Sequence, residues 1–278
     1  MLRGVVMAFS TLVLNCEFAA AELVYLVVGS TTSIDFTGFT GSGFQANPVA
    51  GQLDSNDWAA TGWSDGDLAF GGIQTTASTD YTRGTTTGGV TTGGFYAVNN
   101  ITGTSGVSFG IQPGGFDWTP GTLTLQIRNN TGVALNSISI GYDLFVRNDQ
   151  GRSNSFNFSY AVGALDAPGT FTGSVINNDS FVSTAASDGL GWVSQRSSTA
   201  LTSFATTVNN GQSVFLRWSG TDIGGSGSRD EFAIDNISFS GITAVPEPSS
   251  MILIAMAGAV AAVSKRCNRF GRQKFCKL

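Results

Sequence analysis

The sequence predicts an all-β fold, a two-sheet antiparallel sandwich of the jelly-roll-like type, for residues 22–244. Apolar and polar residues alternate in short runs such as 123–128, 155–160 and 232–239. A period of two places one face of a strand on the core and the other in solvent. Asn- and Gly-rich turn sequences such as 209–211 separate the runs, and they supply the backbone conformations of tight turns. Abundant threonine also favours strands, because its β-branched side chain suits a pleated sheet.

The composition of this body restricts its chemistry. Residues 22–245 contain no Lys, no His and no Cys, and 17 acidic residues stand against seven arginines. This acidic balance argues against nucleic acid, whose phosphates require Lys and Arg. The missing residue types exclude a Ser-His-Asp triad, a thiol nucleophile and a Cys or His zinc site. We therefore expect a non-enzymatic protein without disulfides in its body, with a Thr/Gly-rich surface loop at 75–92.

The front of the chain has the pattern of a secretory signal peptide, at residues 1–21. Arg3 supplies a positive charge, 4–14 is an apolar run, and small residues at 19–21 offer a cleavage site. Charged, apolar and small segments in this order direct export. Cys16 suggests lipidation instead, but Asn15 stands where a small residue is expected.

The back of the chain, residues 245–278, has a different composition. Pro246 and Pro248 cannot donate backbone hydrogen bonds and end the strand pattern. An uninterrupted apolar segment follows at 251–263, and 264–278 is basic. As a helix, the apolar segment rises only about 20 Å against a hydrocarbon core of about 30 Å. It predicts a weak membrane span with its basic end in the cytoplasm. An ordinary membrane anchor and a buried terminal helix are the alternatives.

Together, Pro246, Glu247, Pro248, the apolar segment and the basic end resemble the PEP-CTERM sorting signal of Gram-negative bacteria. The resemblance implies recognition by a membrane-embedded exosortase, with membrane contact through 251–263 before processing. The body would then reach the cell envelope, cell surface or extracellular matrix. We expect a structural or adhesive surface protein. The alternatives are a calcium-stabilised carbohydrate-binding module that binds an extracellular polysaccharide and, less favoured, an Asp-based glycoside hydrolase.

Two tryptophans lie in glycine-rich loops from which they could bind a sugar. Trp118 follows Gly115 closely, and Trp192 follows Gly191. An indole face suits the CH-rich face of a pyranose ring, so both are candidates for carbohydrate binding. Filling the core is the competing interpretation.

An aspartate-rich segment at 53–68 surrounds Trp58 and Trp63. Its acidic members are Asp54, Asp57, Asp65 and Asp67. Paired carboxylates beside tryptophan are typical of a glycosidase cleft. The Asp-Ser and Asp-Gly steps fit ordinary turns equally well, and we favour the turn interpretation.

The last strand, at 229–239, resembles the closing strand of jelly-roll carbohydrate-binding modules. Its alternation places Phe232 and Ile234 inward and leaves Glu231 and Asp235 on the opposite face. The resemblance implies that this strand pairs near the N-terminal strand, at 34–36. It also implies that Asp235, with Asp35, could ligate a structural calcium, an ion that prefers oxygen ligands. A surface aspartate that makes turn hydrogen bonds is the alternative.

Overall fold

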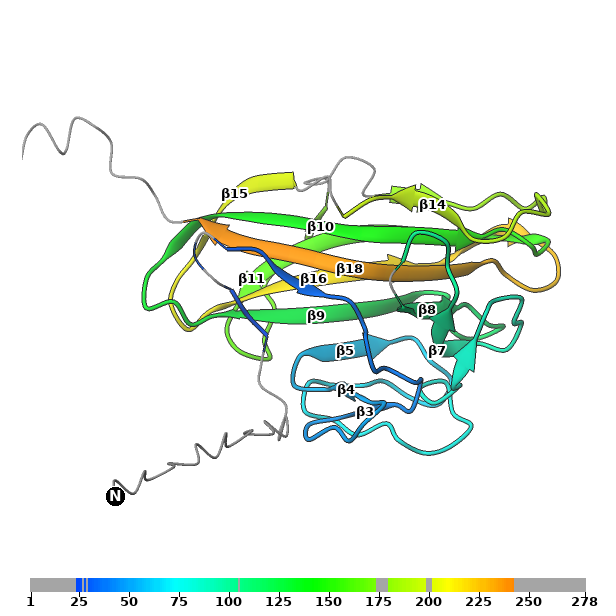
Figure 1. The fold of residues 1–278 in the computed structure, drawn as a ribbon, viewed down its shortest axis with the longest axis horizontal. Coiled ribbons are helices and arrows are strands. Elements are labelled where there is room, and N and C mark those ends of the chain that lie inside the picture. The colour runs from blue at the N-terminus through cyan, green and yellow to red at the C-terminus, as the bar shows by residue number, and fades with distance from the viewer. Residues whose placement is uncertain are drawn as a thin grey trace, which may run out of the picture.

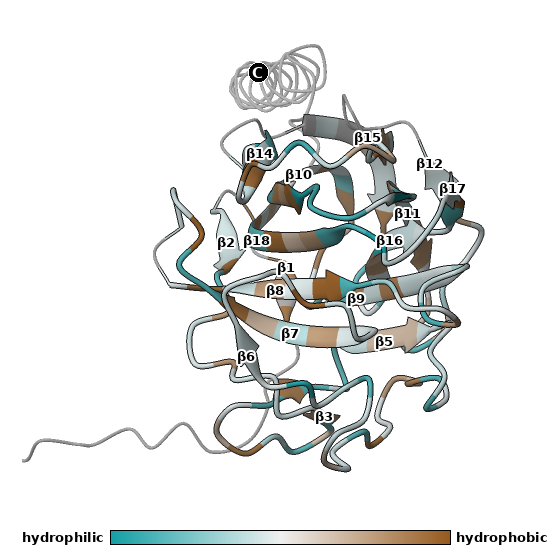
Figure 2. Ribbon diagram, turned by 90° about the vertical axis from the view of Figure 1, so that its right-hand side faces the viewer, coloured by the Kyte–Doolittle hydropathy of each residue, from teal (hydrophilic) through white to brown (hydrophobic). Residues whose placement is uncertain are grey.

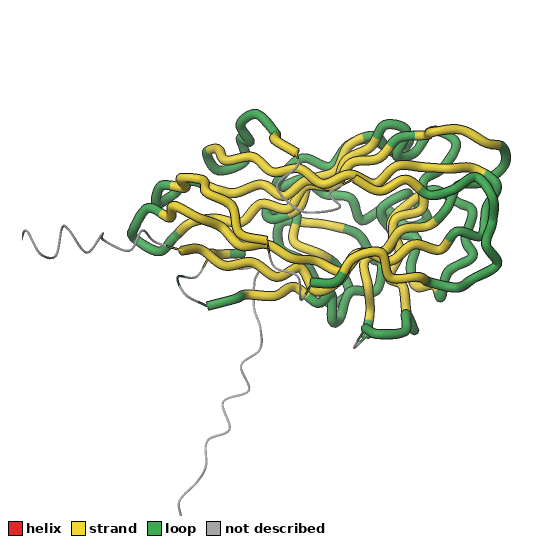
Figure 3. The backbone as a smooth tube through the Cα atoms, turned by 90° about the horizontal axis from the view of Figure 1, so that it is seen from above, coloured by secondary structure: helices red, strands yellow, loops and turns green. Residues whose placement is uncertain are grey.

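The computed structural model describes residues 24–26, 28, 30–104, 106–173, 180–198 and 202–242. Within these ranges the chain forms strands, turns and loops without a helix (Figure 3), which confirms the all-β prediction. The strands are β1 (Tyr25–Leu26), β2 (Thr32–Ile34), β3 (Phe44–Gln45), β4 (Leu53–Asp54), β5 (Trp58–Thr61), β6 (Thr85–Thr86), β7 (Gly94–Asn99), β8 (Val107–Gln112), β9 (Gly121–Asn129), β10 (Leu135–Arg147), β11 (Arg152–Gly163), β12 (Thr172–Gly173), β13 (Ser180–Val182), β14 (Val193–Arg196), β15 (Thr202–Val208), β16 (Ser213–Gly220), β17 (Asp222–Gly225) and β18 (Glu231–Ile242).

The long strands form two sheets that pack face to face (Figure 1). The first sheet has the order β1-β9-β16-β11-β12, with β5 beside β9 and with β13 and β17 beside β11. The second has the order β14-β10-β18-β8-β7-β6, with β15 beside β10 and β2 beside β18. Successive strands β8, β9, β10 and β11 alternate between the sheets, and β16 and β18 return to their centres. Strands that alternate in this way between two packed sheets have the connectivity of a jelly roll, which confirms the predicted sandwich.

The N-terminal strand closes onto the last strand, as the sequence predicts. β2 runs antiparallel to β18, with Ile34 opposite Ile237 and Thr32 opposite Phe239. β18 also lies between β10 and β8, so it is paired along both of its edges. Its side chains therefore contact the core on one face and covering loops on the other.

Aromatic side chains fill the space between the sheets. Figure 2 shows hydrophobic residues along the ribbons of both sheets. Trp58 stacks on Phe109 at 6.0 Å between ring centroids and on Trp218 at 6.3 Å. Phe156 stacks on Phe232 at 5.0 Å. Each large ring buries about 150–250 Å², so this core stabilises the body where disulfides are absent.

The predicted loop at 75–92 is largely without strands, but it packs more closely than a surface loop. Tyr81 is fully buried, and its hydroxyl donates to the Gly66 carbonyl at 2.7 Å. Arg83 pairs with the buried carboxylate of Asp80 at 2.6 Å. The loop is therefore fixed at several points, and its second half reaches the face of the second sheet.

Candidate functional site

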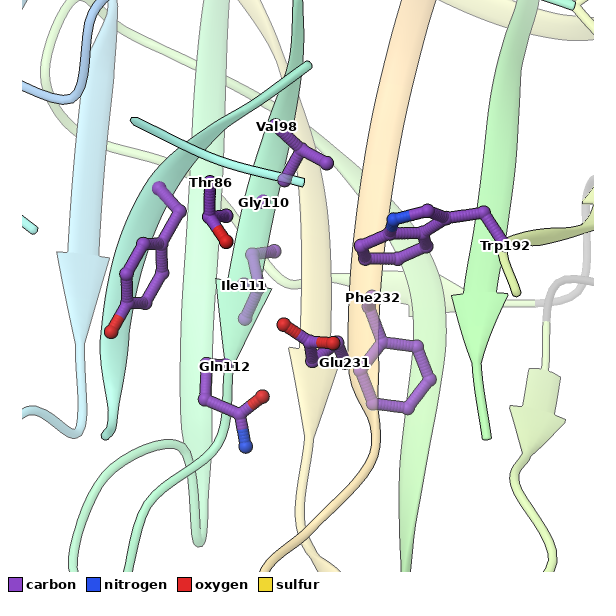
Figure 4. Close-up of a pocket in the computed structure, with 9 residues that line it drawn as sticks. Thr86, Val98, Gly110, Ile111, Gln112, Trp192, Glu231 and Phe232 are labelled. Atoms are coloured by element: carbon purple, nitrogen blue, oxygen red, sulfur yellow. The ribbon is translucent and has the colours of Figure 1, made fainter. Parts of the chain in front are cut away.

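A narrow crevice lies on the outer face of the second sheet, where β7, β8 and β18 run side by side. Tyr96, Gln112, Glu231 and Trp192 are among the residues that line it. Figure 4 shows the side chains of Gln112, Glu231 and Trp192 reaching the crevice from β8, from β18 and from the residue that precedes β14. The space is too tight for a water molecule. We call it the Glu231 crevice.

A short strap, residues 86–90, covers this crevice and is held by two side chains. The Glu231 carboxylate accepts the backbone N–H of Gly89 at 2.6 Å and that of Val90 at 3.1 Å. The Trp192 indole N–H donates to the Thr87 carbonyl at 3.0 Å. Glycine is required at position 88, because its φ is +102° and a Cβ there would lie 2.8 Å from the Trp192 indole nitrogen. The strap therefore closes over the crevice.

Glu231 is a buried acid with limited chemical freedom. Burial raises its pKa to about 7, against the lowering effect of the two backbone N–H donors and of Arg147. The Arg147 Nε lies 3.4 Å from Glu231 and 2.7 Å from Asp149. No second carboxylate belongs to the described lining of the crevice. The geometry fits a latch that holds the strap; it lacks the facing carboxylates of a glycosidase.

The two candidate sugar-binding tryptophans have different environments. Trp118 is fully buried and stacks on Phe156 at 6.2 Å, so it is a core residue and our assignment of it as a sugar platform is wrong. The Trp118 indole packs directly against Gly220, and a Cβ at this position would overlap the indole nitrogen. Trp192 is half-buried and packs against the outer-face cluster that contains Tyr96. Part of its surface faces solvent, so it stays a candidate.

The two candidate calcium ligands also differ. Asp235 is buried, and its two oxygens accept hydrogen bonds from Ser108 Oγ at 2.9 Å and from the Asn236 N–H at 2.8 Å. Its pKa is raised to about 6, mainly by burial and to a smaller extent by the negative charge of the neighbouring Asp143. Asp35 is exposed and accepts the Thr37 N–H at 3.0 Å. Across the described ranges, no three acidic side chains converge in an arrangement that could hold a metal ion. Calcium at Asp235 and Asp35 stays a prediction.

The aspartate-rich segment at 53–68 follows the turn interpretation. Asp54 accepts the Asn56 N–H at 2.9 Å, and Asp67 accepts the Gly62 N–H at 2.9 Å. Asp57 is buried and accepts the Val24 N–H at 2.9 Å; burial raises its pKa to about 7. Trp58 and Trp63 are both buried. These aspartates hold loops and the N-terminal segment, and the two indoles offer no exposed platform.

A second hollow, which sequence reasoning missed, lies where the edges of the two sheets meet. It has a volume of about 280 Å³ and is bordered by β13 of the first sheet, β14 of the second and the end of β10. We call it the edge groove. Its residues come from segments far apart in the sequence and without a shared motif, so no local pattern could have identified it.

The proposed sorting residues Pro246, Glu247 and Pro248 lie outside the described residues, as does the apolar segment 251–263. Among the residues that are described, none belongs to a helix with the length and apolar character needed to span a bilayer. The assignment of the tail therefore depends on its sequence.

Comparison with solved structures gives distant likenesses. The tandem CBM22-1-CBM22-2 domain of Paenibacillus barcinonensis Xyn10C is 12% identical with a TM-score of 0.40, over 79% of this chain and 48% of that one. The CBM22-1 xylan-binding domain of the same protein is 7% identical with a TM-score of 0.36, over 81% of this chain and 100% of that one. A CBM35 from Paenibacillus barcinonensis is 16% identical with a TM-score of 0.27, over 52% and 88%. Likenesses at this level do not identify a ligand.

Sequence comparison identifies the tail more directly. No curated protein matches the chain. A family model described as the PEP-CTERM protein-sorting motif matches residues 244–266, which include Pro246, Glu247, Pro248, the apolar segment and the first basic residues. Such a motif indicates export and delivery to the cell envelope. The chain is thus a strand-rich sandwich that carries a PEP-CTERM sorting motif at its C-terminal end.

Proposed function

We propose that this protein is a non-enzymatic structural or adhesive component of the cell surface or extracellular matrix. In this proposal an exosortase-type enzyme recognises the tail at Pro246, Glu247 and Pro248 and removes it. The proposal rests on the sorting motif at 244–266, together with the signal-like sequence at the N-terminus. The apolar segment would hold the chain in the membrane only until processing, because it is short for a permanent span.

The proposal is tested by ending the chain at residue 245. We expect the truncated protein to pass the inner membrane and to accumulate in the periplasm or medium, because it has lost both the sorting motif and the membrane stop. Immunoblots of cell fractions would measure this, with the full chain from the same promoter as the control. Unchanged retention in the envelope would contradict the sorting proposal.

Carbohydrate binding is the second candidate function, and the half-buried Trp192 favours it. If its exposed surface stacks on a sugar, Trp192→Ala should weaken polysaccharide binding by roughly threefold to tenfold, the range expected for loss of one aromatic contact. Trp192→Phe keeps an aromatic ring and should retain most of the affinity. A glycan array followed by titration calorimetry would measure both variants. Equal affinity of Trp192→Ala and the unaltered chain would remove Trp192 from the binding surface.

A further inference from the structure

The edge groove has an apolar floor. Phe181 and Val146 form part of it, and the Phe181 ring meets the core residue Phe232 edge-on at 6.3 Å between centroids. Val193 of β14 adds a third apolar side chain. Phe181 is only half-buried, so an aromatic surface remains in contact with the groove. A volume of about 280 Å³ is near the lower end of small-molecule sites, roughly 300–1,000 Å³.

The rim of the groove carries one accessible carboxylate. Asp188 is exposed and uses its Oδ1 to accept the Leu190 N–H at 2.8 Å. The amide of Asn148 donates to Thr184 Oγ1 at 2.7 Å and to the Ala186 carbonyl at 3.0 Å, which holds the loop beside the groove. The Asn148 Oδ1 itself is buried. Asp188 is therefore the acceptor that a ligand in the groove can reach.

Charge around the groove selects among ligands. No Lys or Arg is among the described residues that line it, whereas Asp188 is. The negative charge of Asp188 disfavours phosphate, sulfate and uronic acid groups, because like charges repel. A carboxylate acceptor beside an aromatic surface suits hydroxyl groups on an apolar ring.

We propose that the edge groove binds one or two pyranose units of a neutral polysaccharide, with the apolar ring face on Phe181 and a ring hydroxyl donating to Asp188. This inference deepens the proposed adhesive function, because it places the adhesive contact at a different position from Trp192. A divalent cation fits the groove less well, since no three acidic side chains in the described part of the chain converge to hold one.

The test uses the full chain, purified in detergent and titrated with neutral gluco-, xylo- and manno-oligosaccharides. We expect binding to at least one of them, and about tenfold weaker binding for Asp188→Ala, because this variant removes the accessible hydrogen-bond acceptor of the groove. Asp166→Ala is the matched control, since Asp166 is also exposed and accepts a hydrogen bond, from Gln126 Nε2 at 3.1 Å. Oligogalacturonate should not compete. Thermal melts would show that each variant is folded.

Several results would overturn the inference. One is the absence of heat with every neutral oligosaccharide at millimolar concentration, although the chain sorts to the envelope as proposed. Another is a loss of affinity for Trp192→Ala but not for Asp188→Ala, which would place the sugar on the exposed surface of Trp192 instead of in the edge groove. A third is saturable binding of calcium that Asp188→Ala abolishes, which would make the groove a cation site. The localisation experiment is independent of all three, so failure of the groove and failure of sorting are distinguishable.

Discussion

Trp118→Ala is expected to lower the free energy of unfolding by about 3–5 kcal/mol, the usual cost of removing a large aromatic side chain from a core. Trp118 is fully buried and lies between Phe156 and Trp63. The neighbouring strand also closes on it at Gly220, so the cavity left by alanine has little freedom to collapse. Urea denaturation would measure the change.

Trp192→Ala is the matched control for this prediction. Trp192 is half-buried and packs on the outer face of the second sheet, so its loss should cost only about 1–2 kcal/mol. Equal effects of the two variants would show that Trp118 is not a core residue. A normal stability of Trp118→Ala combined with lost sugar binding would restore its assignment as a binding residue.

The protein is expected to be more stable at pH 5 than at pH 8. Burial raises the pKa of Asp57 and of Glu231 to about 7 and that of Asp235 to about 6. Each folded pKa is above the unfolded one, so between the two values the folded state binds more protons and its stability falls as pH rises. We expect a loss of about 2 kcal/mol from each of Asp57 and Glu231 between pH 5 and pH 8, and less from Asp235.

Urea midpoints at the two pH values would measure this dependence. Asp222 has the opposite behaviour, because its hydrogen bond to Arg152 lowers its pKa. Its contribution is lost only below the ordinary aspartate range, outside this window. Glu231→Gln should reduce the pH dependence, since glutamine does not titrate. A stability that rises from pH 5 to pH 8 would contradict the burial of these carboxyl groups.

The alternating pattern predicted the strands well. Phe232 and Ile234 lie in the core, and Trp218 does as well. The face that carries Glu231 is opposite to theirs, as predicted, but the strap covers it. Period-two alternation reports which side chains share a face of a strand; it does not report what covers that face.

The candidate site depends on contacts that the sequence could not supply. Glu231 meets Gly89 and Val90 across 142 and 141 residues of chain. Trp118 lies in a glycine-rich loop, and the sequence of such a loop suggests an exposed position. The indole is buried because Gly220 of β16 approaches it closely in the folded chain. Loops have no periodicity from which burial can be predicted, so tertiary packing decides these positions.

The tail, unlike the candidate site, could be predicted from the sequence. Its function was predicted from residues 245–278 alone, and the sorting motif is confirmed at 244–266. Recognition of Pro246, Glu247 and Pro248 depends on a short linear segment with an apolar and a basic part. Such a signal is contained in the sequence and needs no fold to be recognised.

Delivery by the sorting motif can be measured by fractionating cells that express the chain ended at residue 245, together with the intact mass of the envelope form of the full chain. We expect the truncated protein to be absent from the envelope, and the full chain found there to have lost its basic end, 264–278. A truncated protein that stays in the envelope, or a mature full chain that still ends at Leu278, would contradict delivery by the sorting motif.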